Sequence, residues 1–377
     1  MLRLISRACG EISYHLKTNE FSNCEVLMFC NEPNTRAGGG FGQRDRRCVD
    51  VIIAAWNCEE TIGRAIASAL AQTEVRTVIV VDDASTDRTV ECAYAADDSS
   101  ARLVIFRFPE NRGPAAARNK ALALCTAPWV AVLDGDDYFM LGRFSRMLAL
   151  AEGWDFIADN LLQIPEDHGH FDVLLPTQGR KSFEPFQCSF ETFVLGNIWK
   201  PGRDRKELGF LQPLMRRAFL SEHGLRYNED LRIGEDYAFY AHALAAGAQF
   251  LIVPTIGYVA VTRRNSLSSS ASKKHFERFR DADVAIEALA HLTKAQRAAL
   301  RAHHESIDAI VQWLEVIEAV KDRNASRFMA AYSRSLHAAK YISARLAEQI
   351  VLRSFKRIRR LIPAAGLAES AQIVPAK

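Results

Sequence analysis

Short apolar runs alternate with helical patterns between residues 49 and 134. Each run ends at a cluster of polar residues, which indicates a buried strand. The predicted strands are Val49–Ala55, Thr77–Val81, Leu103–Phe106 and Val130–Leu133. Between them apolar side chains recur at helical spacing. The predicted helices cover 59–72, a stretch that Ser85 or Asp87 can cap and that ends at Ala95, and Pro114–Leu124. Strands alternating with helices predict an α/β fold with a doubly wound, mostly parallel sheet.

Further along the chain this alternation gives way to continuous helical spacing. A helix over 141–151, a strand over 155–159, a helix ending at Ala246 and a strand over 259–261 complete the α/β part. From Lys273 onward, helices are predicted over 273–292, 294–320, 325–337 and 338–362. We therefore expect an α/β domain over 48–270, a helical C-terminal region over 271–362 and a flexible tail over 363–377.

Residues 1–47 differ in composition from the rest. They end in Gly38-Gly39-Gly40-Phe41-Gly42 and a charged stretch, which is typical of a linker. We expect a poorly ordered N-terminal extension and assign it no function. Met28 offers a second start site, and the sequence leaves open whether residues 1–27 are translated.

Charge and cysteine content narrow the class of protein. The formal net charge of +3 is too small to indicate nucleic-acid binding. None of the 8 cysteines belongs to a Cys-x-x-Cys pair, so neither a zinc site nor a thioredoxin-like site is indicated. No apolar run approaches the roughly 18 residues that cross a bilayer, and the first residues lack a secretory core. We expect a cytoplasmic protein with reduced thiols.

The first candidate site is acidic. The strand over 130–133 runs directly into Asp134, Asp136 and Asp137. Open α/β sheets bind ligands at the carboxyl ends of their strands, and carboxylates crowded there repel one another unless a cation holds them. Mg²⁺ and Mn²⁺ take oxygen ligands and bind through one or two carboxylates plus substrate phosphates. A metal site and an ordinary acidic turn both fit this stretch taken alone.

Other phosphate and metal motifs are absent or weak. The first strand is followed by Trp56-Asn57-Cys58-Glu59 rather than a Gly-x-Gly-x-x-Gly turn, and no Gly-x-x-x-x-Gly-Lys loop follows any strand. A ligand that carries phosphate would therefore need a metal ion. His168-Gly-His170 is interpreted as a polar loop, because carboxylates suit a hard ion better than imidazole does.

Four stretches in order resemble the signatures of family 2 glycosyltransferases. They are 51–57 (Val-Ile-Ile-Ala-Ala-Trp-Asn), 80–87 (Val-Val-Asp-Asp-Ala-Ser-Thr-Asp), 111–119 (Asn-Arg-Gly-Pro-Ala-Ala-Ala-Arg-Asn) and 133–137 (Leu-Asp-Gly-Asp-Asp). The resemblance extends more loosely to about residue 270 and is similar in style to bacterial exopolysaccharide enzymes of the succinoglycan type. It implies the GT-A fold, an inverting transfer and a nucleotide-diphosphate sugar donor, with a UDP-sugar expected.

The resemblance also implies roles in donor binding. Ala54, Ala55 and Trp56 would border the nucleobase, and Asp83, with Asp82 as the alternative, would accept a hydrogen bond from a uracil N–H.

For the diphosphate, the resemblance places Arg118 and Asn119 beside it, although a structural salt bridge is the alternative for Arg118. Asp134 would lie behind the metal ligands or face the sugar, Asp136 would face the ribose or metal, and Asp137 the metal. Arg263 and Arg264 would close over the diphosphate, and a solvated basic loop is the alternative for them.

A second acidic pair, Glu235-Asp236, lies where family members carry the general base. Asp236 would take the proton from the acceptor hydroxyl, and Glu235 would orient the acceptor or the base. The alternative is that both are simply favourable acids at a helix N-terminus.

These inferences combine into one expected function. The chain is expected to be a metal-dependent glycosyltransferase that moves a sugar, glucose from UDP-glucose being the expected donor, onto a lipid-linked oligosaccharide in exopolysaccharide synthesis. Two rivals remain, a sugar nucleotidyltransferase and a sugar-nucleotide-binding scaffold without turnover. The sequence leaves open the donor sugar, the acceptor, the linkage position and the oligomeric state.

The last predicted helix, 338–362, is basic and amphipathic. Val351, Phe355 and Ile358 fall on one face, and several arginines and a lysine fall on the others. Such a helix can lie on an anionic membrane surface, and here that would be the inner face of the plasma membrane. Packing of the helix on the catalytic domain, with a solvated basic side, is the alternative.

Overall fold

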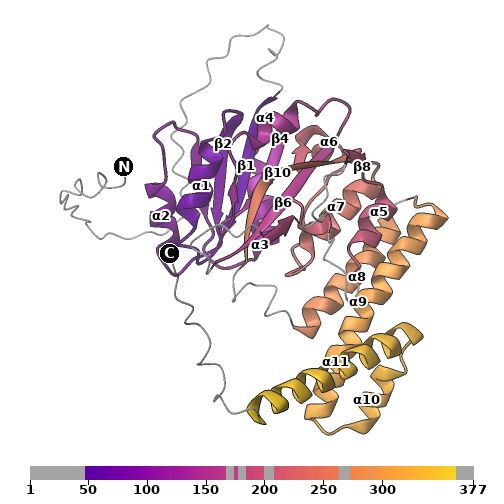
Figure 1. Cartoon of the computed structure of the whole chain (residues 1–377). Helices are drawn as coiled ribbons and strands as arrows, with labels where there is room; N and C mark the ends of the chain where they lie inside the picture. Colours follow the sequence, from indigo (N-terminus) through magenta and orange to yellow (C-terminus); the bar gives the residue numbers. More distant parts are fainter. Residues whose placement is uncertain are drawn as a thin grey trace, which may run out of the picture. The chain divides into compact units, whose positions relative to one another are not determined.

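The fold is described from a computed structural model of the whole chain, over residues 47–166, 174–176, 184–198, 208–262, 272–289 and 291–361. Its centre is a ten-stranded mixed sheet (Figure 1). The strands are β1 Val49–Ala55, β2 Val75–Asp82, β3 Leu103–Arg107, β4 Trp129–Asp134, β5 Tyr138–Phe139, β6 Phe156–Pro165, β7 Leu174–Pro176, β8 Phe186–Gln187, β9 Leu214–Arg216 and β10 Phe250–Thr262.

The order of the strands creates a ligand-binding edge. Along the sheet the order is β3-β2-β1-β4-β9-β6-β10-β5, and β3, β2, β1 and β4 are parallel. The chain moves outward from β1 to β3 and then returns to β4 on the other side of β1. This reversal is the topological switch point at which open sheets bind ligands. Ala54 pairs with Asp134 there, so the first strand ends beside the acidic stretch.

The helices cover the sheet and then continue beyond it (Figure 1). They are α1 Ile62–Leu70, α2 Thr89–Ala95, α3 Pro114–Leu124, α4 Arg143–Leu148, α5 Phe190–Gly196, α6 Arg217–Glu222, α7 Glu235–Ala245, α8 Lys273–Leu289, α9 Lys294–Lys321, α10 Ala325–Tyr332 and α11 Leu336–Leu361, with a 3₁₀ turn η2 at Leu208–Phe210. The α/β class and the helical C-terminal region are confirmed. The pattern did not predict β9, which lies antiparallel between β4 and β6.

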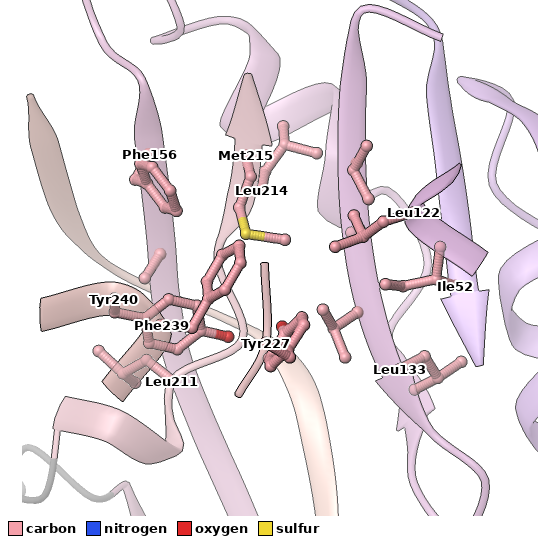
Figure 2. Close-up of a cluster of buried hydrophobic side chains, with 14 of the residues drawn as sticks. Ile52, Leu122, Leu133, Phe156, Leu211, Leu214, Met215, Tyr227, Phe239 and Tyr240 are labelled. Atoms are coloured by element: carbon pink, nitrogen blue, oxygen red, sulfur yellow. The ribbon is translucent and has the colours of Figure 1, made fainter. Parts of the chain in front are cut away.

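A cluster of large side chains forms the core beneath the acidic edge. Figure 2 shows Tyr227, Phe239 and Tyr240 among Phe156, Leu214 and Met215 from β6 and β9. The rings of Tyr227 and Phe239 stack at 4.3 Å and 12°. Phe239 and Tyr240 belong to α7, so this packing fixes the helix that begins with Glu235 and Asp236.

The C-terminal helices divide between two cores. Ala282 and Ile286 of α8 and Leu300 of α9 belong to the same buried cluster as the sheet. Trp313, Val316, Ala331, Ala338 and Ile342 form a separate cluster of α9, α10 and α11. The α8 helix and the first part of α9 are therefore built into the α/β core. In the part of the chain described here, no helix has both the length and the apolar character that crossing a membrane requires.

Candidate active site

A pocket of about 960 Å³ opens at the switch point and collects most of the predicted site residues. Its lining includes Ala54, Ala55, Trp56, Asp83, Arg118, Asp134, Asp136, Asp137, Glu235 and Asp236. Residues from five parts of the sequence thus meet at one edge of the sheet. The pocket then continues along side chains of α8, α9 and α11.

The loops after β1 and β2 are tied together at one end of this pocket. Asn57 donates its backbone N–H to Ser85 Oγ at 3.0 Å, and its side-chain oxygen accepts from the backbone N–H of Thr86 at 2.8 Å. Trp56 stays 45% exposed at the rim. An exposed aromatic ring on a fixed loop is suited to contact a flat ligand.

Asp83 is buried at the same end of the pocket. Its two carboxylate oxygens accept the backbone N–H groups of Arg112 at 2.6 Å and Gly113 at 2.7 Å. Gly113 has a φ of +93°, and the guanidinium of Arg232 occupies the space that a Cβ there would need. This turn therefore requires glycine, and it holds the carboxylate in one orientation toward the pocket.

Two predicted donor-binding residues do not reach the pocket. Asp82 is buried and pairs with Arg107, with a separation of 3.2 Å between Oδ2 and Nε. Asn119 exchanges hydrogen bonds with the backbone of Tyr227, donating at 2.9 Å and accepting at 2.8 Å. The geometry favours a structural role for both. For Asn119 the reason is helical: consecutive residues point about 100° apart, so Arg118 and Asn119 cannot face the same side.

At the end of β4 the three aspartates differ in environment. Asp137 is buried, and its oxygens accept from Tyr258 Oη at 2.7 Å and the backbone N–H of Val261 at 2.8 Å. Burial, and then the carboxylates of Asp134 and Asp136, raise its pKa well above the ordinary value. A neighbouring cation would favour the ionised form instead.

The intervening Gly135 lets this turn approach β1. A Cβ at Gly135 would lie 3.0 Å from Cys58 Sγ. The carbonyl of Gly135 also accepts a hydrogen bond from Thr61 Oγ1 at 2.9 Å. The acidic turn is therefore held against the start of α1 and cannot move freely away from β1.

Arg118 joins the two acidic clusters from α3. Its guanidinium contacts Asp134 at 2.7 Å, Glu235 at 2.8 Å and Asp236 at 3.4 Å. Burial alone lowers the pKa of Arg118, but Asp236, Asp134 and Glu235 outweigh it and hold the pKa well above the ordinary value. Arg118 thus forms ion pairs with carboxylates of both acidic clusters, and its role in binding a diphosphate stays a prediction.

Asp236, the second residue of the α7 pair, has a raised pKa. Its burial raises the pKa to about 7, against the opposing effect of Arg118 and with a further rise from Glu235 and Asp134. Efficient proton transfer favours a pKa near the working pH. The residue before the pair, Gly234, has a φ of +73° and packs against the ring of Phe279, so it too has to be glycine.

The acidic turn fits a divalent ion whose ligands come partly from the protein and partly from substrate and water. Over the described ranges, no group of three or more His, Cys, Asp and Glu side chains is arranged to hold a metal. Asp136 and Asp137 supply two carboxylates at the pocket. Mg²⁺ and Mn²⁺ sites that serve phosphates use one or two carboxylates and complete their shell from substrate and water. The donor set therefore fits such an ion.

The structure does not describe every residue that the sequence singled out. Arg263, Arg264, His168 and His170 lie outside the described residues. Conversely, sequence reasoning missed several polar residues that line the pocket, among them Asn197, Gln212, Arg232 and Tyr258. Gln212 and Tyr258 sit in apolar stretches, where a lone polar residue was the available signal.

Comparisons with known proteins identify the family of the chain. Residues 50–189 match the family model described as glycosyl transferase family 2. The chain is 49% identical over 264 residues to the succinoglycan biosynthesis protein ExoU of Rhizobium meliloti (strain 1021), which covers 69% of this chain and 75% of that protein. It is 37% identical over 105 residues, 28% of this chain and 41% of the other, to the Escherichia coli UDP-Glc:alpha-D-GlcNAc-diphosphoundecaprenol beta-1,3-glucosyltransferase WfaP.

A solved structure extends the likeness to the fold. The S. aureus TarS 1–349 complex with UDP-GlcNAc aligns with a TM-score of 0.56 and 18% identity, over 76% of this chain and 90% of that one. The predicted GT-A fold is confirmed by this likeness and the family match. The chain is a member of glycosyl transferase family 2.

Proposed function

We propose that this glycosyltransferase moves a sugar, with glucose from UDP-glucose as the expected donor, onto a lipid-linked saccharide during synthesis of a succinoglycan-type exopolysaccharide. The observation that carries the proposal is the position of Asp236. Its carboxylate lines the same pocket as Asp136 and Asp137, and Arg118 joins it to the end of β4. The names of ExoU and WfaP support the polysaccharide and the acceptor class.

In the proposed reaction Asp236 accepts the proton of the acceptor hydroxyl as that oxygen attacks the anomeric carbon. Glu235 contacts the same Arg118 guanidinium as Asp236 does, and it would orient the acceptor or the base. Asp136 and Asp137 would hold Mg²⁺ or Mn²⁺. When bound, the ion supplies charge stabilisation to the departing diphosphate. The attack on the face opposite the diphosphate would invert the anomeric centre.

The nucleobase would lie between Trp56 and Asp83. Both oxygens of Asp83 already accept backbone N–H groups, yet each carboxylate oxygen can accept a second hydrogen bond. The ring N–H of uracil is a suitable donor, while adenine lacks one at the matching ring position. Arg232, beside Gly113, adds a cation near the same end. This supports a uridine donor over an adenosine donor.

Titration calorimetry with UDP tests the proposal. The wild-type protein should bind UDP in the presence of Mn²⁺ and lose most of the affinity in chelator. Asp137→Asn should bind UDP about as weakly with Mn²⁺ as the wild type does in chelator. Binding of GDP or TDP instead of UDP would change the donor assignment. Absence of binding to any nucleoside diphosphate would overturn the donor site. UDP binding without transfer would favour the scaffold alternative, and pyrophosphate release from UTP with sugar phosphate would favour the nucleotidyltransferase.

Peripheral membrane contact through residues 338–362 is a separate part of the proposal. The sequence places Arg353, Lys356, Arg357 and Arg360 in the last half of α11. Basic residues near an anionic leaflet contribute about 1 kcal/mol each to membrane binding. Replacing these four with Glu should release the protein from phosphatidylserine vesicles in a flotation assay, and unchanged flotation would contradict it.

A further inference from the structure

The pocket extends well past Asp236, along a wall formed by the C-terminal helices. Phe276 and Phe279 of α8, Ile307 and Ile310 of α9, and Tyr341 and Arg345 of α11 line this extension. We propose that it is a binding groove for the acceptor, and that its occupant is the saccharide chain rather than the lipid. The proposal rests on the proposed function and names the part of the substrate that this groove recognises.

The position of the groove follows from the chemistry at Asp236. The nucleotide end of the pocket lies at β1 and β4, with Trp56, Asp83 and the aspartates of the acidic turn. An acceptor hydroxyl has to reach Asp236 while the donor fills that end. The space left for the acceptor is therefore the other end of the pocket, whose wall is α8, α9 and α11.

The composition of the wall fits a sugar better than a hydrocarbon chain. Phe276, Ile307 and Ile310 give apolar contact, while Ser306, Tyr341 and Arg345 give hydrogen-bonding groups along the same stretch. A pyranose has one face of C–H groups and a rim of hydroxyls, so it needs both kinds of contact. An isoprenoid chain carries no hydrogen-bonding groups, so it would match only the apolar part of this wall.

The groove is fixed to the catalytic pair on both sides. Before the pair, Phe279 packs against Gly234. After it, Tyr237 donates its hydroxyl to Asp283 at 2.8 Å and stacks on the ring of His303 at 4.1 Å and 17°.

The same network links the two helices of the wall. His303 Nδ1 contacts the other oxygen of Asp283 at 2.7 Å, and both residues are buried. Asp283 belongs to α8 and His303 to α9, so a single buried network sets the position of both helices relative to Asp236. A saccharide held by these helices would thus be held at a defined distance from the base.

The test measures acceptor kinetics with and without lipid. The first acceptor is the lipid-linked saccharide extracted from membranes of Rhizobium meliloti, the organism of the ExoU relative, and the second is the water-soluble saccharide released from it by mild acid. Phe276→Ala and Ile310→Ala are each expected to raise the KM for both acceptors about tenfold, as truncation at the centre of a contact surface does. Their affinity for UDP should equal that of the wild type.

Val284→Ala is the matched control, because Val284 is on α8 but is 55% exposed and does not line the pocket. It should leave the acceptor KM unchanged. Equal KM values for Phe276→Ala, Ile310→Ala and wild type would overturn the proposal. A rise in KM with the lipid-linked acceptor alone would also overturn it and assign the groove to lipid. If the wild type neither binds UDP nor transfers sugar, the proposed function itself fails, and the groove assignment fails with it.

Discussion

The two acidic clusters of the pocket are made of the same groups but differ in what balances their charge. At the end of β4, Asp137 is buried beside Asp134 and Asp136, and its pKa is raised well above the ordinary value by burial and by those carboxylates. At the start of α7, burial raises the pKa of Asp236 too, but Arg118 opposes this and the pKa stays at about 7.

This difference separates two chemical roles. At the β4 cluster Arg118 reaches Asp134, while the hydrogen-bond donors to Asp137, which are Tyr258 Oη and the backbone N–H of Val261, are uncharged. Such a cluster favours a bound cation. The α7 pair already has its cation, and Asp236 can exchange a proton near neutral pH. When their environments give similar groups different pKa values, one site can use these groups for different tasks.

The strongest test of this comparison removes the carboxylate that is proposed to accept the proton. Asp236→Asn keeps the shape of the side chain but cannot take a proton, so turnover should fall by about 10³-fold, within the range for loss of a general base. Affinity for UDP should change little, because the nucleotide end is intact. Steady-state transfer rates and UDP calorimetry on the same preparation check both parts.

Asp230→Asn is the control for Asp236→Asn, as an exposed aspartate on the loop that leads to α7. It should transfer at the wild-type rate. If Asp236→Asn also transferred at that rate, the assignment of the base would be wrong and the α7 pair would be no more than favourable acids at a helix start.

Removing the shared cation should affect both clusters at once. Arg118→Met leaves Asp134, Glu235 and Asp236 without their common partner. Breaking a buried ion pair from one side costs about 3–5 kcal/mol, so the free energy of unfolding should fall by that order. Urea unfolding at pH 7 measures it.

Arg118→Lys is the informative companion, since it keeps one charge but cannot contact three carboxylates in a fixed fork. Its stability should fall between those of Arg118→Met and wild type. Equal stability of all three proteins would mean that the Arg118 contacts contribute nothing net to the fold.

The sequence located both clusters but not the connection between them. Asp134 and Glu235 are far apart in the chain, and only the switch-point topology brings each within 2.8 Å of the same guanidinium. The apolar runs and the four motifs predicted β1 to β4 well, because these strands are parallel and, except for β3 at the edge of the sheet, largely buried. The short antiparallel β9 was missed because three residues give no periodic signal.

The packing of the C-terminal helices on the start of α7 was equally beyond sequence reasoning. Helical spacing predicted α8 and α9, but no local pattern pairs Tyr237 with Asp283 and His303. Contacts between residues remote in sequence depend on tertiary packing. The same is true of the pocket-lining residues Gln212 and Tyr258.

The rate of sugar transfer should change gradually with pH, which is a smaller effect than those of the substitutions above. Because the pKa of Asp236 is raised to about 7, kcat/KM should fall about tenfold per pH unit below pH 7 and level off above it. Arg118→Met should shift this limb to higher pH, since Arg118 lowers the pKa of Asp236 more than Gln212 does. A flat profile from pH 5 to 8 would contradict the assigned base.

The raised pKa of Asp236 also predicts how the stability of the protein changes with pH. Between the ordinary pKa of 3.8 and about 7, folded Asp236 holds a proton that the unfolded chain has lost. Stability decreases with pH wherever the folded state binds more protons. The contribution of Asp236 is therefore fully present below pH 4 and is lost as the pH rises to about 7. Asp236→Asn should remove this part of the pH dependence, which urea unfolding at several pH values would show.

The smallest expected effect concerns Asn119, the neighbour of Arg118 on α3. Its side chain holds the backbone of Tyr227, whose ring lies beneath the guanidinium of Arg118 at 5.5 Å. Asn119→Ala should lower the free energy of unfolding by about 1–2 kcal/mol, the cost of leaving backbone groups unpaired. Affinity for UDP should stay at the wild-type value. A weaker affinity for UDP with unchanged stability would instead place Asn119 at the diphosphate, and would mean that α3 contributes two side chains to donor binding.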